Sequence, residues 1–205
     1  MDLPHLEMIS GKPVLFVMAV PMEYGAELKK RINPLMCGVG PVESAMTLTR
    51  GLTLLSASES LPSHIVSLGS AGSRTLDQGE VYQAESVSYR DMDASPLGFT
   101  KGITPFVDHP VDIPLLAPLD HPKVRLSTGA NIVSGDAYAG IDADMVDMET
   151  FALKRTADAF SIPLIGLRGI SDGKEELSKY EDWADYLHDV DEKLAHAIDD
   201  LKAVL

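Results

Sequence analysis

The sequence predicts an α/β fold, in which helices pack against a largely parallel or mixed β-sheet. Continuous apolar runs, which are typical of strands buried on both faces, alternate along the chain with helical patterns. With 205 residues, of which 45% are hydrophobic, the chain is long enough to bury a sizeable core. We therefore expect one domain over residues 1–205.

The first half of the chain predicts strands and helices in alternation. Residues 14–20 (VLFVMAV) are an apolar run expected to form a buried strand, and residues 23–31 predict a short helix. A longer helix is predicted over 41–58, because Pro41 suits its first turn. Residues 64–68 (HIVSL) predict a second buried strand, and the alternating pattern of 81–89 predicts a third strand.

The second half begins with a long irregular segment. Residues 92–122 are rich in proline and lack periodicity, so we expect an excursion without regular structure. Short strands are predicted at 124–127 and 131–134, a helix at 148–160 and a buried strand at 163–170. Apolar residues three and four positions apart predict a final helix: Leu187, Val190, Leu194, Ile198, Leu201 and Leu205.

Composition excludes several classes of partner. The formal net charge is -14, which disfavours nucleic acid and anionic membrane surfaces. Cys37 is the one cysteine, which rules out an intramolecular disulfide and is typical of a reducing cytoplasm. The N-terminus does not read as a signal peptide, and the longest apolar runs are too short for a membrane span. The scattered histidines predict no metal site, and no cofactor is expected.

Polar or glycine-rich residues follow the predicted strands. Glu23 follows the first, GSAG at 69–72 the second and VDMET at 146–150 another, and Asp172, in SDG at 171–173, follows the strand at 163–170. Each has a simpler structural explanation, such as a tight turn for GSAG or helix capping for VDMET. In α/β folds, however, ligands bind at the carboxyl ends of strands, so their joint order predicts a site.

Taken in order, seven segments resemble the nucleoside phosphorylase/nucleosidase superfamily, most closely its 5'-methylthioadenosine/S-adenosylhomocysteine nucleosidases. They are VMAVPMEY, GVGPVESA, SLGSAGS, YRDMDASPLGF, NIVSGDAYA, VDMETFA and LRGISDG. The resemblance implies a three-layer sandwich with a central mixed β-sheet flanked by helices, as in nucleoside phosphorylases. It also implies a cofactor-independent hydrolase that releases adenine from a small-molecule nucleoside.

The resemblance assigns the catalytic roles. It implies that Asp172 is the general acid that protonates N7 of adenine. Glu23 would be the base that activates water at the anomeric carbon, with Arg168 and Ser70 near that water. This pair of carboxyl groups follows the logic of inverting glycosidases. Asp172 would need surroundings that hold its proton, because an ordinary aspartate ionises near about 3.9.

The resemblance also assigns the binding residues. Glu149 would accept hydrogen bonds from the ribose hydroxyls, with Met148 beside the sugar. Tyr138 matches the family's phenylalanine that stacks on the purine, and the backbone of Ala139 would read its Watson–Crick edge. Asp147 has a weaker claim and is expected to support the helix start. The remaining substrate-binding positions are Ala71, Gly72, Val39 and Ser171.

A homodimer is implied as well, because a neighbouring subunit closes the family's pocket around the 5'-substituent. The matching positions are Ala94, Leu97 and Pro105, of which Ala94 and Leu97 are small enough to predict a roomier 5'-pocket. Trp183 or Tyr180 would supply a lid aromatic.

Hydrolysis is favoured over phosphorolysis by the absence of a phosphate-gripping arginine near the GSAG loop. The related phosphorylases place one where this chain has Ser67, and no arginine follows the first strand before Arg31. The chain is also shorter than family members between Glu23 and Gly38 and between Tyr138 and Val146. Alternatives are a nucleosidase for futalosine-type nucleosides or 5'-deoxyadenosine, a purine nucleoside phosphorylase, and a non-catalytic nucleoside-binding protein.

Overall fold

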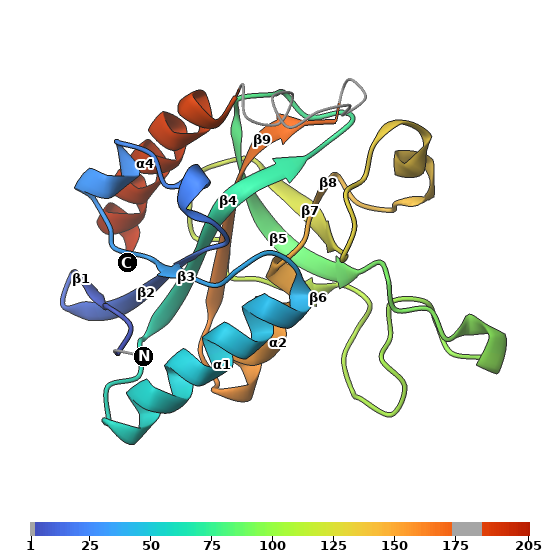
Figure 1. Ribbon diagram of the computed structural model, residues 1–205, viewed down its shortest axis with the longest axis horizontal. Helices are drawn as coiled ribbons and strands as arrows, with labels where there is room; N and C mark the ends of the chain where they lie inside the picture. The colour runs from blue at the N-terminus through green and yellow to red at the C-terminus, as the bar shows by residue number, and fades with distance from the viewer. Residues whose placement is uncertain (1–2, 174–185) are drawn as a thin grey trace.

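A mixed β-sheet separates the helices into two layers in the computed structural model, which describes residues 3–173 and 186–205 (Figure 1). Helices α1 (Pro41–Ala57) and α2 (Thr150–Ala159) lie together on one side, and α4 (Leu187–Val204) packs on the opposite side. The predicted central sheet flanked by helices is therefore confirmed.

Nine strands make up the sheet in the described residues. They are β1 (Glu7–Ile9), β2 (Lys12–Met18), β3 (Leu35–Met36), β4 (His64–Gly72), β5 (Val81–Tyr89), β6 (Ile113–Pro114), β7 (Lys123–Thr128), β8 (Met145–Asp147) and β9 (Leu164–Asp172). Parallel strands β2, β4 and β9 end at the same edge. Strand β4 pairs with β8 and β9, β5 pairs with β7 and β9, and β7 pairs with β8, so these five strands close a ring. This ring brings the end of β8 beside the ends of β4 and β9.

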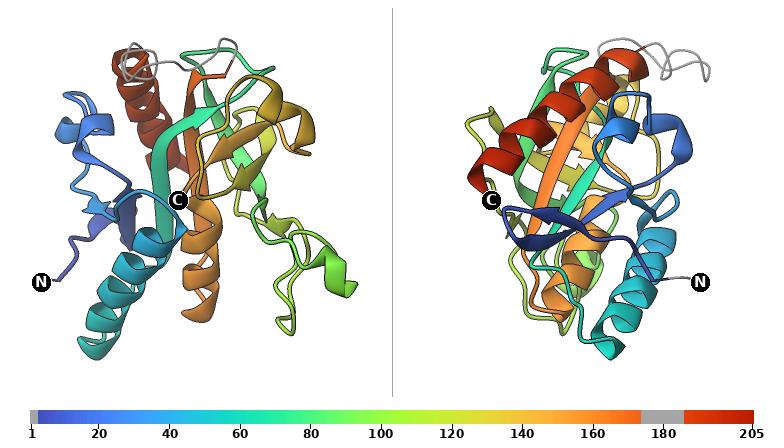
Figure 2. Two further views of the ribbon diagram at one scale, coloured as in Figure 1. Left: turned by 45° about the vertical axis from the view of Figure 1, so that its right-hand side comes forward. Right: turned by 90° about the vertical axis from the view of Figure 1, so that its left-hand side faces the viewer.

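The core lies on both faces of this sheet, which explains the continuous apolar runs of its central strands. One cluster joins the sheet to α1 and α2 through residues such as Leu52 and Leu153. The other joins it to α4 through residues such as Phe16 and Leu194. Figure 2 shows α4 running across the sheet on the side away from α1 and α2.

Two predicted elements are wrong. Residues 23–31 form no continuous helix but the short turns η1 (Pro21–Glu23) and η2 (Leu28–Lys30). The reason lies in α4, because the Asp191 carboxylate accepts hydrogen bonds from Glu27 N at 2.8 Å and Leu28 N at 3.1 Å. Residues 131–134 form no strand and lead instead into the turn η4 (Gly135–Gly140).

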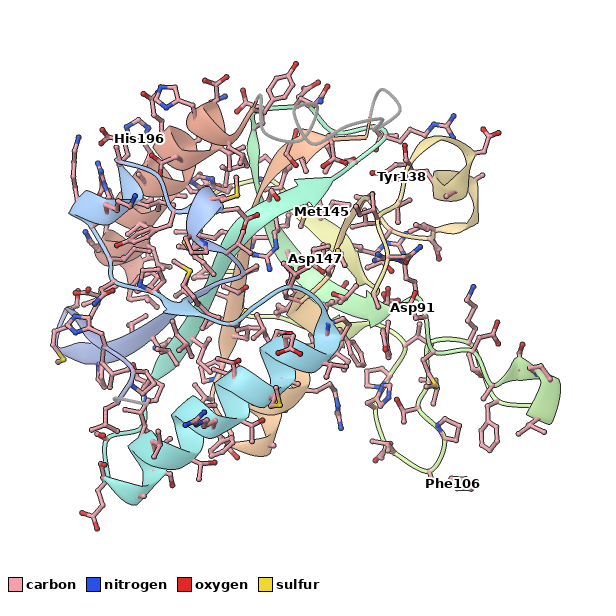
Figure 3. All side chains as sticks on the ribbon, viewed as in Figure 1. Asp91, Phe106, Tyr138, Met145, Asp147 and His196 are labelled. Carbon is pink, nitrogen blue, oxygen red and sulfur yellow. The ribbon has the colours of Figure 1, made fainter. Side chains whose placement is uncertain are left out.

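The segment after β5 projects from the body of the molecule and carries the short turn η3 (Ser95–Leu97) (Figures 1 and 2). Leu97 is 81% exposed, and Phe106, which is labelled in Figure 3, is 98% exposed. The irregular excursion predicted over 92–122 is confirmed except for the short elements η3 and β6. Among the described residues, no helix has the length and apolar character needed to cross a membrane.

Candidate active site

A cavity of about 360 Å³ opens where the ends of β2, β4, β8 and β9 meet. Carboxyl groups from different elements line it: Glu23, Asp147, Glu149 and Asp172. Most of the remaining predicted site residues line it too: Ser70, Ala71, Gly72, Val39 and Met148. The tertiary structure thus brings together residues that lie far apart in the sequence.

Glu23 enters the cavity from η1, just after β2, and is buried. Its Oε1 accepts hydrogen bonds from Ser70 N at 2.8 Å and from Ser70 Oγ at 2.6 Å. Gly69 leaves room for this contact, because a Cβ there would lie 3.2 Å from Glu23 Oε2. Burial raises the pKa of Glu23, and the hydrogen bonds from Ser70 oppose that rise.

Glu149 stands at the start of α2 and is held by the start of α1. Its Oε1 accepts a hydrogen bond from Gly40 N at 2.9 Å. Burial, and next the negative charge of Asp147, raise the pKa of Glu149 to about 7. The carboxyl group therefore changes its charge close to neutral pH.

Asp147 forms a buried ion pair with Arg168, with Arg168 Nη2 3.0 Å from Asp147 Oδ2. The same oxygen accepts from Thr150 N at 3.0 Å, which starts α2 at Thr150 rather than at the predicted residue 148. Asp147 therefore supports the helix start, as predicted, and also neutralises Arg168. Arg168 lies behind the main cavity, where it lines a second, much smaller cavity of about 10 Å³ together with Glu23.

Asp172 ends β9 and faces Gly72 of β4. Ser171 Oγ donates a hydrogen bond to Asp172 Oδ2 at 2.8 Å, while Oδ1 lies 2.7 Å from the point that a Cβ on Gly72 would occupy. Ser171 itself is buried behind Asp172 and does not line the cavity. Burial raises the pKa of Asp172, which is the kind of environment that an aspartic acid needs to keep its proton.

Tyr138 lies beside this acid but outside the cavity lining. Its hydroxyl oxygen is even closer than Asp172 Oδ1 to the position of a Cβ on Gly72. Figure 3 shows Tyr138 on the η4 side of the strand ends. Ala139, next in the chain, is exposed and does not line the cavity either. The stacking role of Tyr138 and the edge-reading role of Ala139 stay predictions.

Arg90 lines the cavity, although the sequence reasoning did not assign it. It follows β5 and donates to the backbone carbonyls of Ser127 at 2.6 Å, Asp147 at 2.9 Å and Asn131 at 2.7 Å. These bonds tie the ends of β7 and β8 to the segment before η4. Arg90 belongs to the segment YRDMDASPLGF, but a lone arginine after a predicted strand does not by itself indicate a site residue.

The residues expected to serve a neighbouring subunit lie elsewhere. Ala94, Leu97 and Pro105 belong to the projecting segment, and none of them lines the cavity of its own chain. The predicted lid aromatics, Trp183 and Tyr180, lie outside the described residues. Within the described ranges, no cluster of histidine, cysteine, aspartate and glutamate is arranged to hold a metal ion.

Comparisons with known proteins show the family of this chain. Residues 19–204 match the family model of the phosphorylase superfamily. The chain is 26% identical over 171 residues to the 5'-methylthioadenosine/S-adenosylhomocysteine nucleosidase of Baumannia cicadellinicola subsp. Homalodisca coagulata, covering 73% of this chain and 71% of that one. It is 29% identical over 166 residues to the same-named protein of Staphylococcus aureus (strain MRSA252), with 69% of each chain covered.

Solved structures show the same fold at low identity. Futalosine hydrolase of Helicobacter pylori strain 26695 superposes with a TM-score of 0.77 at 17% identity, covering 94% of this chain and 97% of that one. A 5'-methylthioadenosine/S-adenosylhomocysteine nucleosidase from Colwellia psychrerythraea 34H, in complex with adenine, gives a TM-score of 0.76 at 17% identity, with 98% and 97% covered.

Proposed function

Because the chain belongs to the phosphorylase superfamily, we propose that it hydrolyses the N-glycosidic bond of a 5'-modified adenosine and releases adenine. The enzyme class, an N-glycosyl hydrolase, is that of its named nucleosidase relatives. The proposed substrates are 5'-methylthioadenosine, S-adenosylhomocysteine or a close relative of these nucleosides.

One observation carries the proposal: the buried carboxyl groups of Glu23 and Asp172 lie on the same cavity at the ends of different strands. Burial raises the pKa of Asp172, so Asp172 keeps a proton and donates it to N7 of the departing purine. Burial also raises the pKa of Glu23, which makes it a stronger base than an exposed glutamate. Glu23 takes a proton from the attacking water. Ser70 orients it through its hydrogen bonds to Oε1.

Glu149 and Met148 form the proposed sugar site. Both line the cavity next to each other, and the ionised Glu149 carboxylate accepts hydrogen bonds from the ribose hydroxyls. The sugar acquires positive charge as the glycosidic bond breaks. Nearby negative charge on Glu149 and Glu23 stabilises that charge in a partly dry cavity.

Water, rather than phosphate, is the proposed nucleophile because the cavity is lined by more carboxyl groups than cations. Glu23, Asp147, Glu149 and Asp172 line it, against Arg90. Arg90 already donates to backbone carbonyls, and Arg168 is paired with Asp147 behind the cavity. The ionised carboxylates of Glu23 and Glu149 would repel a phosphate dianion there.

The test is to incubate the purified protein with 5'-methylthioadenosine, with and without phosphate, and to follow adenine and the sugar product by chromatography. We expect adenine and methylthioribose at a rate independent of phosphate. Asp172→Asn, which retains shape but has no acidic proton, should lower kcat by about 10²–10⁴-fold. Asp120→Asn, at an exposed position away from the cavity, is the matched control and should keep wild-type kcat.

Other products would contradict specific parts of the proposal. A sugar phosphate would mean that phosphate is the nucleophile. Nucleoside binding without any turnover in the wild type would identify a binding protein. Equal losses in Asp172→Asn and Asp120→Asn would remove Asp172 from the mechanism.

A further inference from the structure

The hydroxyl group of Tyr138 is a buried donor and acceptor without a hydrogen-bond partner in the described part of the chain. A buried hydroxyl left unpaired is energetically costly, so such groups are rare and call for an explanation. Burial and the nearby Asp172 charge raise the pKa of Tyr138, which keeps the hydroxyl protonated. It therefore remains able to donate a hydrogen bond at neutral pH.

The position of this hydroxyl is set by Gly72. The hydroxyl oxygen of Tyr138 and Oδ1 of Asp172 both crowd the point where a Cβ on Gly72 would lie, so they share one small region. The hydrogen bond that Asp172 accepts from Ser171 goes to the other oxygen, Oδ2. Gly72 and Asp172 both line the main cavity. A ligand atom that reaches Oδ1 of Asp172 therefore comes close to the Tyr138 hydroxyl.

The hydrogen-bonding groups on the edge of a purine base show what the Tyr138 hydroxyl would contact. N7 and the 6-substituent lie side by side on one edge of the base. Adenine presents an acceptor at N7 and a donor at the amino group, so a single carboxylic acid can donate to one and accept from the other. A 6-oxopurine presents two acceptors on this edge. An acid that gives its one proton to N7 cannot also serve the 6-oxo oxygen, which needs a second donor.

We propose that Tyr138 is a specificity-determining residue whose hydroxyl donates a hydrogen bond to the 6-oxo oxygen of the base, so that the enzyme also cleaves 6-oxopurine nucleosides. This role takes the place of the stacking role that the resemblance implies for Tyr138, because a ring lying flat on the base cannot aim its hydroxyl at the base edge. The phenylalanine that the family resemblance places at this position has no such donor. The inference rests on the proposed function, because it assumes that Asp172 protonates N7. It extends the substrate class from adenine nucleosides to their 6-oxo counterparts.

The experiment compares kcat/KM for 5'-methylthioadenosine and 5'-methylthioinosine, which differ only in the 6-substituent. We expect the wild type to cleave both. In Tyr138→Phe, the preference for the adenine nucleoside over the 6-oxo nucleoside should rise by about 10–100-fold, because only the 6-oxo oxygen loses its donor. Tyr82→Phe is the matched control, since the Tyr82 hydroxyl accepts from Asp77 N and lies outside the cavity lining. It should leave the ratio unchanged.

The ratio distinguishes this role from a structural one, which would change both substrates alike. An unchanged ratio in Tyr138→Phe overturns the inference, and so does a wild type that cleaves only the adenine nucleoside. A folded wild type that cleaves neither nucleoside overturns the proposed function and this inference with it. Calorimetry of hypoxanthine and adenine binding gives a second readout. Tyr138→Phe should weaken the binding of hypoxanthine more than the binding of adenine.

Discussion

The Glu149 carboxyl group shows how burial sets chemistry at the scale of a single residue. Its pKa is raised to about 7 because it is buried and lies near Asp147. Below this pH the group is mostly neutral and accepts hydrogen bonds from ribose hydroxyls less strongly. Above it the group is ionised and suited to that role.

We therefore expect kcat/KM for 5'-methylthioadenosine to rise with pH through about 7 as Glu149 ionises. The value of kcat/KM should fall again at higher pH, where Asp172 loses its proton; burial raises the pKa of Asp172. The measurement is a pH profile of kcat/KM for the wild type and Glu149→Gln. The glutamine variant should lack the rise near pH 7, and an identical rise in both proteins would contradict this assignment.

Some residues of the site are predictable from the sequence, and one is not. Glu23, Glu149 and Asp172 were predicted from motifs, and the structure places them on one cavity. Arg90 was missed because an arginine after a strand carries no signal of its own. Its place is decided by the carbonyls of Ser127, Asp147 and Asn131, which come from separate segments.

At the scale of elements, helix α4 holds the segment that carries Glu23. The Asp191 carboxylate is buried and accepts hydrogen bonds from the backbone of Glu27 and Leu28. Gly25 packs against it so closely that the carboxyl atoms lie within 2.7 Å of where a Cβ would be. Helix α4 therefore fixes the path of the chain just after Glu23.

We expect Asp191→Ala to lower the free energy of unfolding by about 2–4 kcal/mol, because buried backbone N–H groups lose their acceptor. The same change should lower kcat by releasing the segment after Glu23. Asp199→Ala removes an exposed carboxylate of the same helix that pairs with Arg31, and should cost less than about 1 kcal/mol. Urea unfolding and steady-state kinetics provide the measurements. Equal effects of the two substitutions would show that Asp191 has no special role.

At the scale of the whole molecule, the projecting segment carries large apolar side chains that are exposed in the described structure. Leu97 and Phe106 are largely exposed, and the segment lies on the side of the molecule opposite β1 (Figure 1). The resemblance to nucleosidases implies that a second copy receives this segment, and we retain the homodimer as a proposal. Large exposed apolar side chains are consistent with a protein–protein contact.

We expect Leu97→Glu to weaken dimer formation and to raise KM, because the segment would no longer close the neighbouring cavity. Met8→Glu is the matched control: Met8 is 65% exposed on β1, at the other side of the molecule. Light scattering over a dilution series, together with KM at each concentration, measures both effects. A wild type that stays monomeric and fully active at every concentration would contradict the dimer.

Local patterns in the sequence are enough to predict the fold class, the order of most elements and the carboxyl groups of the site. Apolar periodicity records which faces are buried, and the motifs lie next to predictable strand ends. Contacts between distant segments set the remaining features. Hydrogen bonds to Asp191 hold residues 23–31 in turns where a helix was predicted, and Asp147 pairs with Arg168. Gly72 allows the Tyr138 hydroxyl to approach Asp172. Each depends on contacts between residues distant in the chain, which local patterns do not encode.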